Sequence, residues 1–159
     1  MKLLAALWVS VGVVAPFNGL DRSLQFTPAQ EVVLVPEART MKINIRMKDR
    51  VIPATLNDSK AAHDFASLLP LSMTLKDYAS TEKVSDLPRR LSTDGAPEGF
   101  DPSVGDIAYY SPWGNLAIYY RDFEYSSGLV PLGTLASGAD LFASSDSMQV
   151  TFELAKDSP

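Results

Sequence analysis

Two seven-residue stretches, one near each end of the main body of the chain, alternate strictly between apolar and polar residues. Residues 41–47 read Met-Lys-Ile-Asn-Ile-Arg-Met, and residues 148–154 read Met-Gln-Val-Thr-Phe-Glu-Leu. A period of two places every second side chain on the same face of an extended strand, so both stretches predict half-buried β-strands. We expect Met148, Val150, Phe152 and Leu154 to point inward. We also expect these first and last strands to pair with each other and thereby close a sheet.

Further short strands are predicted between these two stretches. They cover residues 51–56, 71–75, 106–110, 115–120 and 128–135. Pro53 lacks an N–H group, which favours an edge position for its strand. Many short strands with few helices are typical of a closed barrel, because closure removes exposed strand edges.

One clear α-helix is predicted over about residues 58–69. Asn57, Asp58 and Ser59 are residue types that cap helix N-termini. The apolar residues that follow recur at i, i+3, i+4 and i+7, which places them on one helix face. Pro70 ends the pattern, since the residue before a proline avoids the α region. A single helical turn is also expected at 138–143.

The regular pattern fails in a long irregular excursion over about residues 77–105. Residues 81–83 and 86–88 suggest a turn of helix, and residues 94–102 are dense in turn-forming residues. Long excursions on a small barrel often carry the function. The predicted fold class is therefore mainly β: a closed antiparallel barrel with one clear helix and one long excursion.

The first forty residues differ from the rest of the chain. Residues 1–20 hold one lysine, then an apolar run that ends before Pro16, which has the shape of a secretory signal peptide. The run is too short to span a bilayer comfortably. We therefore expect an exported protein without a stable membrane span after processing; the alternative is a cytoplasmic protein whose N-terminal segment packs on the domain. Residues 21–39 form a connector, and residues 40–155 form the domain.

Charge and composition exclude several classes of function. The net charge is −5 and the pI about 4.8, without a local cluster of Lys and Arg, so nucleic-acid binding is not expected. The chain has no cysteine, which excludes thiolate chemistry, and its one histidine, His63, lies off the apolar helix face. The acids of residues 94–106 do not have the spacing of a calcium-binding loop. We expect no metal and no cofactor. An acidic balance favours a soluble monomer.

Several ordered motifs together resemble one family. They are Asp64-Phe65-Ala66-Ser67-Leu68-Leu69-Pro70-Leu71, Tyr78, Thr81-Glu82-Lys83, Asp86-Leu87-Pro88, Gly105-Asp106-Ile107, Pro112-Trp113-Gly114-Asn115-Leu116 and Tyr125-Ser126-Ser127-Gly128-Leu129. This set resembles the small bacterial-type cyclophilin-like proteins over roughly residues 41–154. The resemblance implies a cyclophilin-like barrel and says little about activity, because that family is largely uncharacterised.

The wider cyclophilin group implies a possible activity, peptidyl-prolyl isomerisation. Its site uses an arginine on the strand after the first helix, a Phe and a Gln near it, and a Trp closely followed by a His. Residues 71–75 contain no arginine, and no histidine follows Trp113. The isomerase residues are therefore not matched, and whether the chain is an enzyme stays open.

Aromatic residues crowd residues 109–125 and give the best candidate for a binding site. Adjacent tyrosines on a strand face opposite sides, so one of each pair lies at the outside or the rim. Tyr109 and Tyr120 can fill the core while their partners join a second packed layer. Trp113 lies in a turn between Pro112 and Gly114, where filling the core is less natural. The candidate ligand-binding residues are Trp113, Asn115, Tyr78, Glu82, Phe65 and Tyr125.

Three functions follow from these features. The first is a binding module that holds a peptide or a small molecule in a cleft near Trp113. The second is a weak peptidyl-prolyl cis-trans isomerase. The third is a non-catalytic interaction domain of an exported protein.

Overall fold

The structure is a computed structural model that describes residues 39–156. The predicted signal peptide and nearly all of the connector lie outside the described residues. The strands are β1 (Met41–Met47), β2 (Arg50–Leu56), β3 (Leu71–Tyr78), β4 (Glu82–Asp86), β5 (Gly99–Phe100), β6 (Asp106–Tyr110), β7 (Asn115–Tyr119), β8 (Ser126–Ser127), β9 (Leu129–Leu135) and β10 (Ser147–Leu154); the helices are α1 (Lys60–Ala66) and the 3₁₀ helix η1 (Ala139–Ser144). Neither helix of residues 39–156 is long and apolar enough to cross a membrane.

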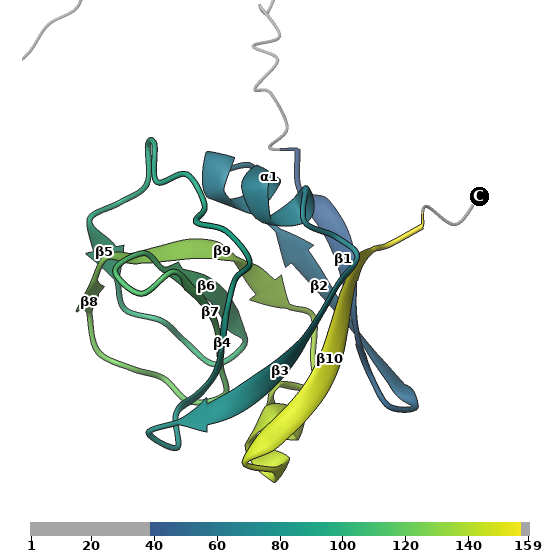
Figure 1. Cartoon of the computed structure of the whole chain (residues 1–159). Coiled ribbons are helices and arrows are strands. Elements are labelled where there is room, and N and C mark those ends of the chain that lie inside the picture. Colours follow the sequence, from purple (N-terminus) through teal and green to yellow (C-terminus); the bar gives the residue numbers. More distant parts are fainter. Residues whose placement is uncertain (1–38, 157–159) are drawn as a thin grey trace, which may run out of the picture. The chain divides into compact units, whose positions relative to one another are not determined.

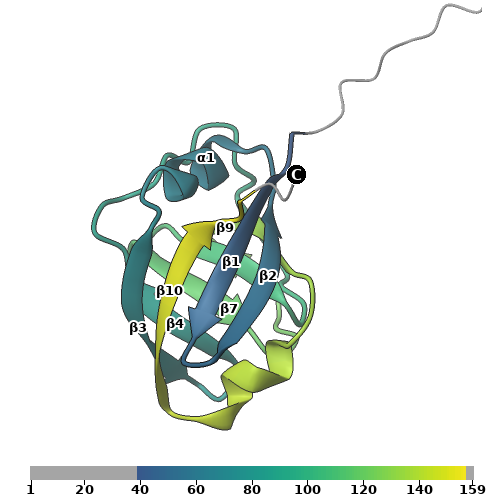
Figure 2. The same ribbon diagram turned by 90° about the vertical axis from the view of Figure 1, so that its right-hand side faces the viewer.

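Eight strands form a closed antiparallel barrel, which confirms the predicted fold class. Their order around the barrel is β1-β10-β3-β4-β7-β6-β9-β2. The predicted pairing of the first and last strands is confirmed, with Ile45 opposite Phe152. In Figure 2, β1 and β10 lie side by side at the front of the barrel. Every barrel strand therefore has a hydrogen-bonded neighbour on both sides.

The alternating strands direct their apolar side chains into the barrel, as predicted. Ile43, Ile45 and Phe152 are fully buried, and Val150 is 1% exposed. Met148 is half-buried and packs against the same cluster. The prediction was wrong for Leu154, which is 52% exposed because it lies past Phe152, the last residue of β10 that pairs with β3.

Helix α1 covers one end of the barrel and η1 covers the other (Figures 1 and 2). Ser59 caps α1, and its Oγ accepts a hydrogen bond from the Ala62 N–H at 3.1 Å. The helix ends at Ala66, earlier than the predicted 69, because the next residues form tight turns. Its Phe65 is fully buried and meets Phe152 edge to face at 5.5 Å. On the opposite end, Phe142 of η1 is also fully buried.

The excursion predicted for residues 77–105 is shorter than expected. Residues 82–86, part of a region predicted to be a turn of helix, form the barrel strand β4, and irregular chain follows from residue 87. The prediction failed because β4 has a reversed pattern. Lys83 points inward, where it is 1% exposed, and Val84 points outward. An inward lysine hides the apolar alternation by which a strand is usually found.

Lys83 is held inside the barrel by an acidic partner from β3. Its Nζ lies 2.5 Å from Oδ1 of Asp77, and the same oxygen accepts a hydrogen bond from the Tyr120 hydroxyl at 2.5 Å. The Lys83 ammonium and the Tyr120 hydroxyl hold the pKa of Asp77 below its usual value. Burial, together with the bond to Asp77, raises the pKa of Tyr120 to about 12. The buried charge is thus paired, as buried charges in proteins must be.

Two prolines lie within barrel strands. Pro53 was expected at a sheet edge, yet β2 lies between β1 and β9. The pairing of β2 with β9 covers Ala54 to Leu56, so Pro53, which lies opposite Asn44 of β1, is just outside the stretch that pairs with β9. Pro131 lies at a bulge where the register between β6 and β9 shifts. Both positions avoid a central ladder bond.

A second, smaller layer covers part of the outer face of the barrel. Strands β5 and β8 pair with each other outside the barrel sheet and lie beside β6 and β9 in Figure 1. Ala108, Ala117, Tyr119 and Leu129 are buried between the sheet and this layer, together with half-buried Phe100. Tyr109 is buried in the main core, and its neighbour Tyr110 packs on the outer cluster. The tyrosines therefore face opposite sides, as the sequence predicted.

Candidate functional site

A pocket with a volume of about 260 Å³ opens on the outer face of β4, β6 and β7. The strand register creates it, because Tyr78 lies opposite Glu82 and Glu82 lies opposite Tyr119, so three side chains form one row across β3, β4 and β7. Asn115 and Tyr110 face each other across β7 and β6. The complete lining is Tyr78, Ala79, Thr81, Glu82, Val84, Tyr110, Trp113, Asn115, Tyr119, Phe123 and Ser126.

Trp113 lies in the four-residue turn between β6 and β7, and the turn itself is well fixed. Gly114 adopts a left-handed conformation with φ of 77°, and its N–H donates to the Tyr110 carbonyl at 2.8 Å. The guanidinium of Arg90 donates to the carbonyls of Ser111 at 2.6 Å and Pro112 at 3.3 Å. These bonds hold the backbone on both sides of the indole. Arg90 was not among the predicted site residues.

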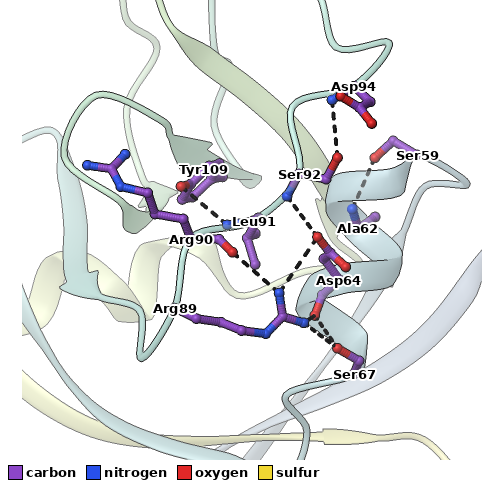
Figure 3. Close-up of polar contacts among 10 residues, drawn as sticks. All are labelled: Ser59, Ala62, Asp64, Ser67, Arg89, Arg90, Leu91, Ser92, Asp94 and Tyr109. Carbon is purple, nitrogen blue, oxygen red and sulfur yellow. Dashed lines mark hydrogen bonds and ion pairs between the residues drawn. The ribbon is translucent and has the colours of Figure 1, made fainter.

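The segment that carries Arg90 is tied to the end of the barrel. The Leu91 N–H donates to the Tyr109 hydroxyl at 3.3 Å, and the Ser92 N–H donates to Oδ2 of Asp64 at 2.7 Å. Figure 3 shows Asp64 of α1 between Ser92 and the guanidinium of Arg89, which also donates to Oγ of Ser67 at 2.7 Å. The helix therefore supports the loop that supports the Trp113 turn.

Three aromatic rings meet at one side of the pocket. The indole of Trp113 lies edge to face with Tyr110, at 5.3 Å between centroids and 83° between planes. It lies edge to face with Tyr78 at 6.0 Å and 79°. Such arrangements are the preferred aromatic contacts. Trp113 nevertheless remains 60% exposed, and Tyr78 remains 46% exposed. Much ring surface is thus open to a bound molecule.

Asn115 is the buried polar residue of the pocket. The residue is 6% exposed, and its Oδ1 atom has no hydrogen-bond partner within residues 39–156. An unpaired buried acceptor costs free energy, about 1–3 kcal/mol, because the atom has lost its water without gaining a donor. Unpaired buried acceptors of this kind are rare in native structures. Because Oδ1 is itself buried, a molecule in the pocket reaches it only if the Asn115 side chain turns.

Glu82 supplies the only carboxyl group among the lining residues. Burial raises the pKa of Glu82, and an interaction with the Tyr119 hydroxyl partly offsets this effect. Burial is also the main reason that the pKa of Tyr119 is raised, with the neighbouring Glu82 as a further cause. No basic side chain of residues 39–156 forms an ion pair with Glu82. The carboxyl group is therefore available to a ligand.

The structure brings together four of the six residues predicted for the site. Trp113, Asn115, Tyr78 and Glu82 all line the pocket. Phe65 does not, because it lies on the core face of α1 and is fully buried inside the barrel. Tyr125 is 58% exposed and lies outside the lining.

Six lining residues with sizeable or polar side chains were not predicted as candidates: Thr81, Val84, Tyr110, Tyr119, Phe123 and Ser126. The paired tyrosines of β6 and β7 could have indicated Tyr110 and Tyr119, since one member of each pair must face outward. The aromatic crowding of residues 109–125 includes Phe123, but its place in irregular chain did not indicate that its ring faces the pocket. Within residues 39–156, no three acidic or histidine side chains gather as metal ligands.

Comparison with known proteins supports the fold. A structural comparison finds the solution structure of a hypothetical protein from Archaeoglobus fulgidus, 18% identical, with a TM-score of 0.55; the match covers 77% of this chain and 100% of that chain. At this identity the likeness shows the fold alone. A search of curated proteins finds none that matches. The sequence model of the cyclophilin-like family matches residues 45–153, most of the barrel. The chain belongs to the cyclophilin-like family.

Proposed function

We propose that the chain is a binding module that holds a small molecule or a short peptide segment in the pocket beside Trp113. One observation carries the proposal: the rings of Trp113, Tyr78 and Phe123 stay about half exposed or more around a pocket of about 260 Å³. Exposed aromatic surface that is held around a pocket offers a ligand apolar contact area.

The aromatic rings supply the apolar part of the binding energy. Trp113, Tyr78 and Phe123 line the pocket while each keeps about half of its surface or more exposed. Covering ring faces removes apolar area from water at low entropic cost, because an aromatic side chain has few rotatable bonds. The volume of about 260 Å³ suits a small ligand or the end of a larger one.

The support beneath the pocket favours binding rather than a passive surface. Arg90 fixes the turn that carries the indole through two carbonyl groups. A preorganised wall loses little conformational entropy when a ligand arrives. A surface with no partner does not require such bracing.

The test is a ligand screen on the native protein and on Trp113→Ala. We expect the variant to keep its melting temperature within a few degrees, because the indole is 60% exposed. The hits found with the native protein should bind the variant at least about tenfold more weakly, since burying a large apolar side chain is worth about 1.5–3 kcal/mol. Tyr125→Ala, which removes an exposed ring outside the lining, is the matched control and should bind as the native protein does. If Trp113→Ala keeps the same hits at the same affinity, the proposal is wrong.

Weak prolyl isomerisation is the second candidate, favoured by the aromatic lining of the pocket, because prolines commonly dock against aromatic side chains. The isomerases of the wider group use an arginine, and no Arg or Lys is among the described residues that line this pocket. Any acceleration would therefore rest on desolvation of the amide alone, against a barrier of about 18–20 kcal/mol. A proline-peptide assay at high protein concentration with no rate above buffer removes this candidate.

Export and a purely structural interaction role are further proposals. They rest on the apolar run of residues 1–20 and on the exposed rings around the pocket. Mass spectrometry of the mature N-terminus tests export. An intact Met1 in the protein isolated from its native cells would contradict it.

A further inference from the structure

The chemistry of the pocket wall identifies a class of ligand. The polar groups of the lining are the carboxyl of Glu82, the amide of Asn115, the indole N–H of Trp113, and the hydroxyls of tyrosine, serine and threonine. Within residues 39–156, the lining contains no lysine, arginine or histidine. The only charge that the described lining residues can carry near neutral pH is therefore the negative charge of Glu82, and no cationic side chain of the lining opposes it.

The rings add a second attraction for positive charge. Trp113 stands at 83° to Tyr110 and at 79° to Tyr78, so the wall presents ring surfaces in different planes. The face of an aromatic ring carries negative potential and attracts a cation within about 6 Å, most strongly when the ring is tryptophan. Rings in several planes can surround one small cationic group, which is how proteins recognise ammonium ligands.

The two basic residues near the pocket, Lys83 and Arg90, do not compensate for the negative potential of Glu82 and the rings. Lys83 follows Glu82 on β4 but points to the other side of the sheet, where it pairs with Asp77. Arg90 is engaged with the carbonyls of Ser111 and Pro112 behind the indole turn. Glu82 itself has no basic partner among the described residues. The whole chain carries a net charge of −5, which also favours the approach of a cation.

We propose that the pocket binds a protonated amine, with its ammonium group at the Glu82 carboxylate and its carbon chain against Tyr78, which lies opposite Glu82, and against Trp113. An ammonium with N–H bonds fits better than a quaternary ammonium, because the carboxylate can accept hydrogen bonds from it. The inference rests on the proposed binding function and names its ligand class. The amine can come from a free alkylamine or from a lysine side chain of a peptide.

The geometry also predicts how binding depends on pH. The titratable groups that face Glu82 are the phenols of Tyr78 on β3 and Tyr119 on β7, with Tyr110 on β6 next to Tyr119. Burial raises the pKa of Glu82 above its ordinary 4.5. Because the amine attracts the ionised carboxylate, its affinity should rise with pH through this raised pKa and then level off. In Glu82→Gln that rise should disappear.

The experiment compares charged and neutral probes of equal size on the full chain. Butan-1-amine and butan-1-ol are titrated near pH 7, with the Trp113 indole N–H resonance and calorimetry as readouts. We expect butan-1-amine to shift the indole signal and to bind at least about tenfold more tightly than butan-1-ol, as charge-assisted hydrogen bonds predict. Glu82→Gln should weaken the amine by about tenfold or more. Asp86→Asn, which removes an exposed acid from the same strand outside the lining, should not change it.

A second pair of probes distinguishes the sources of the amine. A capped tripeptide with a central lysine is compared with the same peptide acetylated on that lysine, which removes the charge. Tighter binding of the unmodified peptide than of butan-1-amine indicates a peptide ligand, and the reverse indicates a free amine; both support the inference.

Two results overturn the inference and can be told apart. If butan-1-ol binds as tightly as butan-1-amine and Glu82→Gln changes neither, the pocket binds neutral molecules; the amine inference fails while the binding function stands. If neither these probes nor a general ligand library affects the Trp113 signal, the binding function fails as well.

Discussion

Replacing Asn115 by leucine should stabilise the protein while it removes the buried acceptor of the pocket. The Oδ1 atom has no partner in residues 39–156, and the residue is 6% exposed. Leucine has the same branching at Cγ but no polar atom, so the penalty of an unpaired buried group disappears. The pocket of about 260 Å³ next to it gives the larger side chain room to settle.

The size of the effect follows from opposing contributions. Relief of an unpaired buried acceptor is worth about 1–3 kcal/mol. Part of this gain is lost to repacking of a larger side chain, so the expected net gain is about 1 kcal/mol. For a domain of this size, that free energy corresponds to a rise in melting temperature of about 4 °C.

Asn57 provides the matched control. Its Oδ1 accepts from the Ser59 N–H at 3.0 Å and its Nδ2 donates to the Pro131 carbonyl at 2.9 Å, so its amide is fully used. Asn57→Leu should therefore destabilise by about 1–2 kcal/mol. Urea unfolding followed by circular dichroism measures both variants. If Asn115→Leu loses as much stability as Asn57→Leu, the Asn115 amide is satisfied in the folded protein, and the reasoning about its unpaired Oδ1 is refuted.

Two further predictions concern the frame around the pocket. Asp77→Ala should cost about 3 kcal/mol or more in urea unfolding, because it leaves Lys83 buried without its partner, and adding Lys83→Met should recover part of the loss. Lys83 lowers the pKa of Asp77, so the contribution of this pair to the free energy of unfolding should be complete above pH 3.8 and should fall as the pH decreases further. If the dependence of stability on pH is the same in Asp77→Ala as in the native protein, this prediction is wrong. Gly128→Ala should destabilise the protein by about 1–2 kcal/mol because Gly128 has a left-handed backbone conformation. The loss should be larger than this, because the added Cβ would lie 2.8 Å from Cδ of Pro112. Gly95→Ala, with φ of 73° and open space around it, should show the backbone cost only, and equal losses in both variants would refute the clash.

Strands with one solvent-exposed face could be predicted from the sequence, and strands covered on both faces were harder to delimit. Residues 41–47 alternate because their outer face meets water, so the period of two is visible. All five residues of β7 are buried, since the barrel core covers one face and the β5–β8 layer covers the other. In β4 the inward Lys83 reversed the pattern, and that strand was missed. The pairing partner that makes an inward lysine tolerable lies on another strand, where a local pattern cannot reveal it.

The candidate site could be predicted as far as local chemistry reaches. Trp113 was found because an indole in a Pro-Gly turn has no obvious core to fill. Phe65 was misplaced although the helical pattern already put it on the apolar face, which here means the barrel interior. Phe123 and the bracing by Arg90 depend on the path of irregular chain. That path is set by tertiary hydrogen bonds, such as the one from the Phe123 N–H to the Pro102 carbonyl.

The pairing of β1 with β10 also decides how this fold can be joined to other polypeptides. The Ala155 N–H donates to the Lys42 carbonyl at 2.9 Å, so the chain enters and leaves the domain at neighbouring points. A host protein can therefore accept the whole domain within one of its surface loops without being pushed apart. By the same geometry, a short linker between the two ends and a new opening in the exposed segment 93–95 would give a circular permutant with all eight strands still in place.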